Sequence, residues 1–157
     1  MSETFINKLR ACCVSGHRII NEDIDVEKLR DIFINLIKKE KVNTFLVGMA
    51  VGFDTICFNL LQKIKKEESI KIIACVPCRN QSKNFNKKEK IEYDKNIRLA
   101  DHIILVSEEY TPYCMIKRNK FMVDNSTFIV YYLREDKGGT KRTVDYAIKQ
   151  ELGLISI

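Results

Sequence analysis

Three glycine-containing segments of this sequence combine a flexible backbone with polar side chains that could contact an anion. They are Ser15-Gly16-His17-Arg18, Gly48-Met49-Ala50-Val51-Gly52-Phe53-Asp54 and Gly138-Gly139-Thr140. A glycine turn lets the backbone approach a ligand because no Cβ obstructs it, and the unpaired N–H groups of a helix start favour phosphate. Alone, the second segment is read more simply as a tight strand-to-helix turn without a ligand. The coincidence of three such turns, each after an apolar run, predicts a phosphate-binding cleft.

Several side chains in these turns have two readings. Arg18 suits bidentate contact with a phosphate or carboxylate, and the alternative is an ion pair with Glu22 or Asp23. His17 fits a ligand contact and a plain loop position equally well. Asp54 fits the N-cap of a helix, and it also fits a hydrogen bond to a ribose hydroxyl. We favour ligand contact for Arg18 and leave the other two open.

A second group of polar residues follows a loop at the same expected rim. Met115-Ile116-Lys117-Arg118-Asn119 begins a helix, so that Arg118 and Asn119 could reach a phosphate or a base, the alternative being a solvated first turn. Three aromatic residues expected to border the rim, Phe85, Tyr93 and Tyr113, could stack on a base or cover an edge of the core.

Other chemistry is disfavoured by the spacing of the residues. No G-x-G-x-x-G fingerprint and no Gly-Lys-Ser/Thr P-loop is present, which argues against a nicotinamide dehydrogenase and a P-loop NTPase. Cys75-Val76-Pro77-Cys78 has the spacing of a redox or zinc pair, but no second pair of suitable ligands accompanies it. We therefore expect neither a metal nor a cofactor, and we expect the six cysteines to be reduced and mostly buried.

Apolar runs alternate with amphipathic segments from start to end. The runs predict strands at residues 9–14, 44–47, 70–76, 102–106 and 127–133, with a small edge strand at 154–157. This pattern indicates an α/β fold, a Rossmann-like, doubly wound, mostly parallel sheet of five to six strands with helices on both faces, in one domain over residues 1–157. The run at 102–106 is nearly all apolar, as in a strand covered on both faces. Ligands of such sheets bind beyond the carboxyl ends of the strands, where the three glycine turns fall.

Composition is ordinary for a globular protein, with 157 residues, 45% hydrophobic and 31% charged. No apolar run approaches the roughly 20 residues of a membrane span, and Met1–Phe5 does not resemble a signal peptide, so we expect a cytoplasmic protein. The net charge of +6 favours anionic partners in general, but the abundant Lys, Asn and Ile are typical of an AT-rich genome, bacterial or phage. The charge therefore carries little weight for nucleic acid. Exposed apolar positions on the helices would permit a homodimer.

Together these features resemble the SLOG superfamily, the Rossmann-like group that includes the Lonely Guy phosphoribohydrolases and the nucleotide-fold domain of DNA-processing protein A. The likeness is greatest to its YpsA-like branch. The matching residues are Ser15 to Arg18, Gly48 to Asp54, Ala100-Asp101, Met115 with Arg118-Asn119, and Gly138-Gly139-Thr140 leading to Ala147. The resemblance implies a doubly wound sheet with a cleft for nucleotides or nucleotide-derived ligands.

The resemblance is weaker for catalysis. Lonely Guy enzymes carry Met-x-x-Arg-Lys and Gly-Gly-x-Gly-Thr-x-x-Glu motifs, whose Arg and Glu support release of a base from a nucleoside monophosphate. Here Arg118 is kept, but Thr143 stands where the Glu would be, so that another acid, Asp54 or Glu92, would have to substitute. The leading hypothesis is therefore binding of a nucleotide or nucleotide-derived ligand for sensing or sequestration. The alternative is an N-glycosidic hydrolase or transferase, and single-stranded DNA binding is a third, less favoured reading.

Overall fold

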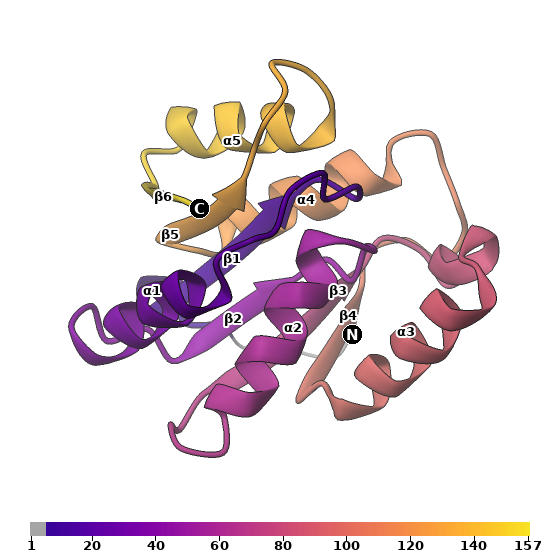
Figure 1. Ribbon diagram of the computed structural model, residues 1–157. Helices are drawn as coiled ribbons and strands as arrows, with labels where there is room; N and C mark the ends of the chain where they lie inside the picture. Colours follow the sequence, from indigo (N-terminus) through magenta and orange to yellow (C-terminus); the bar gives the residue numbers. More distant parts are fainter. Residues whose placement is uncertain (1–5) are drawn as a thin grey trace.

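The computed structural model describes residues 6–157, which form a six-stranded sheet between two layers of helices (Figure 1). All neighbouring strands are parallel, in the order β4-β3-β2-β1-β5-β6. The strands are β1 (Ala11–Gly16), β2 (Thr44–Val47), β3 (Lys71–Val76), β4 (His102–Leu105), β5 (Phe128–Tyr132) and β6 (Gly153–Ser156). The expected Rossmann-like, doubly wound fold is thereby confirmed. The expectation about a signal peptide at Met1–Phe5 lies outside the described residues.

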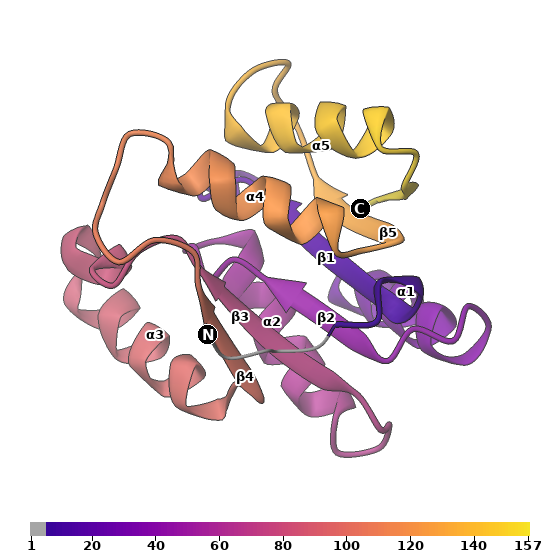
Figure 2. The same ribbon diagram turned by 180° about the vertical axis from the view of Figure 1, so that it is seen from behind.

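Helices cover both faces of the sheet, as Figures 1 and 2 show from opposite sides. Three of them, α1 (Val26–Lys38), α2 (Phe53–Ile64) and α3 (Lys87–Leu99), lie on one face. The other two, α4 (Cys114–Asp124) and α5 (Gly139–Lys149), pack together on the opposite face. Two short 3₁₀ helices, Lys8–Arg10 and Gln81–Asn84, complete the set.

The apolar side chains divide between these two layers because successive residues of a strand point to opposite faces. Cys12 and Val14 of β1 pack with α1 and α2, whereas Ala11 and Cys13 pack with α4 and α5. All six cysteines are free thiols and buried, as expected from the sequence. Central strands covered on both faces leave ligands access only at the ends of the strands.

The order of the strands reverses between β1 and β5. The chain leaves β1 toward β2 on one side, but it leaves β5 toward β6 on the other, with α1 and α5 on opposite faces. Gly16 and Tyr132 are partners at the carboxyl ends of these two strands. The loops that follow them therefore diverge and open a crevice, which is the usual ligand position in this class of fold.

One expectation about the sheet is wrong. The strand at His102–Leu105 is not covered on both faces but lies at the edge of the sheet, with Ile103 51% exposed. An apolar run of four residues is equally compatible with an edge position, because it carries no information on what covers it. The other strands shift by two residues at most from the expected ranges.

Candidate functional site

A cavity of about 1190 Å³ opens at the crevice between β1 and β5. We call it the switch-point cavity. Twelve of the fifteen ligand-binding residues expected from the sequence line it: Ser15, Gly16, His17, Arg18, Ala50, Asp54, Met115, Arg118, Asn119, Gly138, Gly139 and Thr140. They come from the end of β1 and the loop after it, the turn after β2 with the start of α2, the first turns of α4 and the start of α5. The fold thus brings together side chains that are more than a hundred residues apart in sequence.

The remaining three expected residues, Gly48, Met49 and Gly52, lie in the turn after β2 and do not line this cavity. A Cβ on Gly52 would overlap the carbonyl oxygen of Arg18, and the φ of Gly52 is +85°. Met49 also has a positive φ, 65°, although it is buried, which is uncommon for a side chain of this size. This turn is therefore packed tightly against the rest of the protein.

Asp54 follows this turn, but it is not the N-cap of α2. That position belongs to Gly52, and Asp54 is the second residue of the helix. Its Oδ2 accepts a hydrogen bond from the backbone N–H of Ala50 at 3.1 Å, so it closes the glycine turn instead. Burial raises the pKa of this carboxyl from 3.8 to about 6, although the charges of Arg118 and Arg18 and the bond from Ala50 oppose the rise.

Arg118 is the buried cation of the cavity, only 6% exposed. Its Nη1 donates to the carbonyl oxygens of Gly48 and, at 3.3 Å, of Cys75, and its Nε donates to Asn119 Oδ1 at 2.8 Å. A Cβ on Gly48 would lie 2.8 Å from the Arg118 Cζ, so this glycine makes room for the guanidinium. Arg118 is therefore held from the ends of β2 and β3. It is not a solvated first-turn residue, which was the alternative.

The turn before α5, unlike the tightly packed turn after β2, is open to the cavity. Gly138 is its N-cap with φ +95°, and a Cβ on Gly138 or Gly139 would meet no atom within 4 Å. Within residues 6–157, the N–H groups of Gly139, Thr140 and Lys141 have no acceptor, and the first such bond is from Arg142 N–H to Gly138 O at 3.1 Å. Such a helix start is an anion-binding feature because the free N–H groups and the helix dipole act together.

Thr143 lies one turn further along α5. By the resemblance found in the sequence, it stands in place of the Lonely Guy glutamate. Its hydroxyl donates to the carbonyl of Gly139 at 2.8 Å and the residue is 4% exposed. At this position the cavity wall therefore offers a hydroxyl that is already hydrogen-bonded, in place of a carboxylate.

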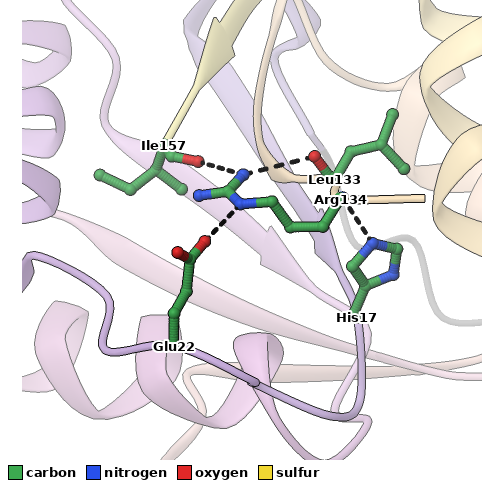
Figure 3. A network of polar contacts seen from close by, with 5 residues as sticks. All are labelled: His17, Glu22, Leu133, Arg134 and Ile157. Carbon is green, nitrogen blue, oxygen red and sulfur yellow. Dashed lines mark hydrogen bonds and ion pairs between the residues drawn. The ribbon is translucent and has the colours of Figure 1, made fainter.

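Arg134 ties the two diverging loops together (Figure 3). Its Nε pairs with Glu22 Oε1 at 2.5 Å, its Nη1 donates to the carbonyl of Ile157 at 3.1 Å, and its guanidinium lies 4.3 Å from the centroid of the Tyr132 ring. Its backbone N–H donates to Nε2 of His17 at 2.7 Å. Glu22, one of the two acids expected as alternative partners for Arg18, is thus paired with Arg134, and the exposed Arg18 lines the cavity.

Sequence reasoning missed most of the charges around the cavity. Its lining cations are Arg18, Arg118, Lys120, Arg134, Lys137, Arg142 and Lys149, and its lining acids are Glu22, Asp54, Glu135 and Asp145. Lys137 and Arg142 flank the Gly138-Gly139 motif, and that position beside a helix start was a signal that could have been used. The excess of cations complements an anionic ligand.

The other candidate residues expected from the sequence lie outside the switch-point cavity. Glu92 pairs with Lys95 at 2.6 Å and lines a separate, smaller cavity between α2 and α3. Phe85 and Tyr93, expected at the rim, also line that smaller cavity and contact each other edge to face. Tyr113 is 72% exposed and does not line the switch-point cavity.

Residues 6–157 contain neither a metal-binding cluster nor a membrane-spanning helix. No group of three or more His, Cys, Asp or Glu side chains in this range is arranged to hold a metal ion. Of the helices in the same range, none is both long enough and apolar enough to cross a membrane.

Solved structures with similar folds include DNA processing protein A from Streptococcus pneumoniae, with a TM-score of 0.65 and 16% identity over 96% of this chain and 51% of that one. DNA processing protein A from Helicobacter pylori, whose structure is described for its single-stranded DNA binding mode, also has a TM-score of 0.65 and 16% identity, over 95% of this chain and 65% of that one. This chain thus spans about half to two thirds of those proteins. At this identity the likeness concerns the fold alone.

Sequence comparison is more specific. The uncharacterized SPbeta prophage-derived protein YoqJ of Bacillus subtilis (strain 168) is 34% identical over 142 residues, which cover 81% of this chain and 82% of YoqJ. The family model YpsA, described as the YspA SLOG family, matches residues 21–153. The match includes the Gly48 to Asp54 turn, Arg118 and the Gly138 to Thr140 turn. The chain therefore belongs to the YpsA SLOG family.

Proposed function

We propose that this protein binds a nucleotide or a nucleotide-derived small molecule in the switch-point cavity and serves to sense or sequester it. The observation that carries the proposal is the open N-terminus of α5 within a cation-rich cavity. Free N–H groups at Gly139 and Thr140, with Arg142 and Lys137 beside them, form a phosphate site of the kind seen at helix starts.

The rest of the cavity supplies partners for the remainder of a nucleotide. The carboxyl of Asp54 can accept from ribose hydroxyls, and Asn119 can pair with the edge of a base. Met115 and Ile116 offer apolar surface at the same wall. The volume of about 1190 Å³ exceeds the roughly 300–1000 Å³ of typical small-molecule sites, so a ligand larger than one mononucleotide, such as ADP-ribose, also fits.

Native mass spectrometry tests the proposal. The purified protein is incubated with a panel of nucleoside monophosphates, cyclic nucleotides and ADP-ribose, and each sample is then analysed by chromatography for released base. We expect a retained mass adduct with no free base, and we expect the adduct to be lost in Arg142→Ala. A control variant, Lys90→Ala on α3, leaves the cavity untouched and should retain the adduct. Absence of any adduct across the panel would contradict the proposal.

A second candidate function is cleavage of an N-glycosidic bond, favoured by one observation. Asp54 lines the same cavity as Arg118, and its pKa of about 6 would let it exchange a proton near neutral pH. In this reading free base accumulates with time and disappears in Asp54→Asn, while Glu92→Gln, which alters the separate cavity, releases base at the wild-type rate. Retained turnover in Asp54→Asn would exclude Asp54 as the acid or base.

Single-stranded DNA is a third ligand, suggested by the single-stranded DNA binding described for the Helicobacter pylori protein. The cations that line the switch-point cavity are the supporting feature here. Binding through phosphates releases counterions, so the affinity for an oligonucleotide would fall steeply as salt is raised from about 50 to about 200 mM. Absent or salt-insensitive binding in a fluorescence anisotropy titration would exclude it.

A further inference from the structure

Three polar residues that are themselves almost fully buried line the switch-point cavity. Ser15 is 8% exposed, and Asp54 and Arg118 are each 6% exposed. Ser15 lies near the carboxyl end of β1, Asp54 in the first turn of α2 and Arg118 in the second turn of α4. We call these three residues the buried floor of the cavity. Charged side chains are seldom buried to this extent unless they are paired, so their hydrogen-bond partners are informative.

Each residue of the buried floor has one polar atom without a partner. Arg118 donates from Nη1 and Nε, and Asp54 accepts from a backbone N–H at Oδ2. Within residues 6–157, Nη2 of Arg118, Oδ1 of Asp54 and the hydroxyl of Ser15 form no hydrogen bond. In that range, the only two side-chain polar atoms that combine complete burial with the lack of a partner belong to other residues. The three free atoms are therefore accessible from the cavity that their residues line.

The buried floor carries little net charge for a phosphate to pair with. The positive charge of Arg118 opposes the rise that burial causes in the pKa of Asp54, so the two opposite charges act on each other. The carboxylate of Asp54 would also repel a phosphate placed beside it. The start of α5, with Lys137 and Arg142 beside its free N–H groups, is the better position for the phosphate. The buried floor is then left for an uncharged part of the ligand.

The free atoms fit a ligand group that both donates and accepts hydrogen bonds. Nη2 of Arg118 only donates, an ionised Asp54 only accepts, and the hydroxyl of Ser15 does both. Two neighbouring hydroxyls of a ribose match this set, because each hydroxyl can donate one hydrogen bond and accept others. A ribose is also the part of a nucleotide that directly adjoins the phosphate.

The edge of a base also carries donors and acceptors, but this end of the cavity offers no aromatic surface for its ring. Tyr132, at the end of the neighbouring strand β5, is 1% exposed. Its ring is stacked on that of Phe53, with centroids 5.9 Å apart, and the guanidinium of Arg134 lies 4.3 Å from its centroid. No free face of this ring is therefore left for a base, which favours the sugar at the buried floor.

We propose that the buried floor binds the 2′,3′-diol of a ribose, so that the cavity selects nucleotides in which both hydroxyls are free. The proposal rests on the nucleotide function proposed above and names the part of the ligand that decides specificity. Internal nucleotides of a DNA strand have neither hydroxyl free. Single-stranded DNA would therefore leave the free atoms of Ser15, Asp54 and Arg118 without partners.

The test is a calorimetric titration of the wild-type protein with AMP, GMP, CMP and UMP and with the 2′,3′-dideoxy counterpart of each. The two ligands of a pair share the phosphate and the base and differ only in the two hydroxyls. We expect at least one ribonucleotide to bind about tenfold more tightly than its dideoxy counterpart, as for the loss of a hydrogen bond to a charged group. Equal affinity within every pair would overturn the proposal. Both ligands are compared on the same protein, so this result does not depend on the folding of a variant.

Variants of the buried floor test which residues carry the preference. Ser15→Ala and Asp54→Asn should each weaken binding of the ribonucleotide by a factor of about three to ten and leave the affinity for the dideoxy nucleotide unchanged. The matched control is Ser126→Ala, which removes a buried hydroxyl that does not line the cavity and should change neither affinity. Unchanged affinities in both floor variants, or equal losses for the two ligands of a pair, would overturn the proposal.

The outcomes also separate this proposal from the nucleotide function. If paired ligands bind equally, the ribose contact is contradicted and the nucleotide function stands. The same holds if a 3′,5′-cyclic nucleotide alone binds, because it has no free 3′-hydroxyl. If ADP-ribose is the only ligand that binds, its unchanged affinity in both floor variants would overturn the ribose contact. If no nucleotide of any kind binds, the nucleotide function is contradicted and the ribose contact with it.

Discussion

The glycine turns before α2 and α5 have similar backbone geometry but different hydrogen bonding. Each places a glycine with positive φ at the N-cap, Gly52 at +85° and Gly138 at +95°, and neither helix has a side-chain cap. At α2 the first helical N–H, that of Phe53, donates to the carbonyl of His17 at 3.1 Å, whereas the first N–H groups of α5 have no acceptor within residues 6–157. The turn before α2 is therefore packed against the protein itself, whereas the turn before α5 leaves space for a ligand.

Because of this difference, we expect the two turns to have different roles in the site, one structural and one in binding. The turn after β2 is closed by Asp54 and holds Arg118 through the carbonyl of Gly48, so it shapes the cavity wall. The turn before α5 is open, and we expect it to contact the phosphate. Substitutions in the first turn should mainly change stability, and substitutions in the second should mainly change binding.

The largest effect is expected for Gly52→Ala. The new Cβ would overlap the carbonyl oxygen of Arg18, and alanine would be strained at φ +85°. Strain and overpacking together should lower the free energy of unfolding by about 4 kcal/mol, measured by urea denaturation. A loss below about 1 kcal/mol would show that the turn is not packed as described.

The next effect is pH-dependent and concerns Asp54→Asn. The folded-state pKa of Asp54, about 6, lies above its ordinary 3.8, so between these values the folded state binds more protons than the unfolded state. Stability contributed by this group is therefore highest below about pH 4 and falls as the pH rises to about 6, by about 3 kcal/mol in total. The amide variant should lack this loss and be more stable than wild type at about pH 8. Urea denaturation of both proteins across this pH range checks this, and parallel profiles would contradict it.

A smaller loss of stability is expected for Arg118→Met, which keeps an apolar stem but removes the guanidinium. Hydrogen bonds to the carbonyls of Gly48 and Cys75 disappear, and the free energy of unfolding should fall by about 2 kcal/mol. Nucleotide binding should weaken in the same variant. If stability were unchanged, Arg118 would not be supporting the turn after β2.

The smallest effect on stability is expected for Gly139→Ala. A Cβ at this position meets no atom within 4 Å, and Gly139 is the first residue of α5, so the free energy of unfolding should change by less than about 0.5 kcal/mol. This variant is the direct counterpart of Gly52→Ala in urea denaturation. A loss of similar size in both would remove the contrast between the two turns.

The sequence was sufficient for the fold because alternating apolar and amphipathic segments specify a parallel sheet, and the carboxyl-end rule then located most of the cavity. It was insufficient wherever the decisive contact is made between distant elements. The residues from Gly48 to Asp54 do not themselves indicate that Arg118, seventy residues later, donates a hydrogen bond to the Gly48 carbonyl. Nor do they indicate that Asp54 closes the turn and does not cap α2. Arg134 was overlooked for the same reason, because its partners Glu22 and Ile157 adjoin it only in the folded chain.

The most direct test of the central claim is a calorimetric titration that compares nucleotides with their own nucleosides. Each nucleoside monophosphate of the panel and ADP-ribose, together with the matching nucleosides, is titrated into wild-type protein and Gly139→Val. We predict that at least one phosphate-bearing ligand binds saturably, that its nucleoside binds at least tenfold more weakly, and that Gly139→Val loses the binding while keeping wild-type stability. Equal affinity for nucleotide and nucleoside, or unchanged binding to Gly139→Val, would contradict a phosphate site at the start of α5.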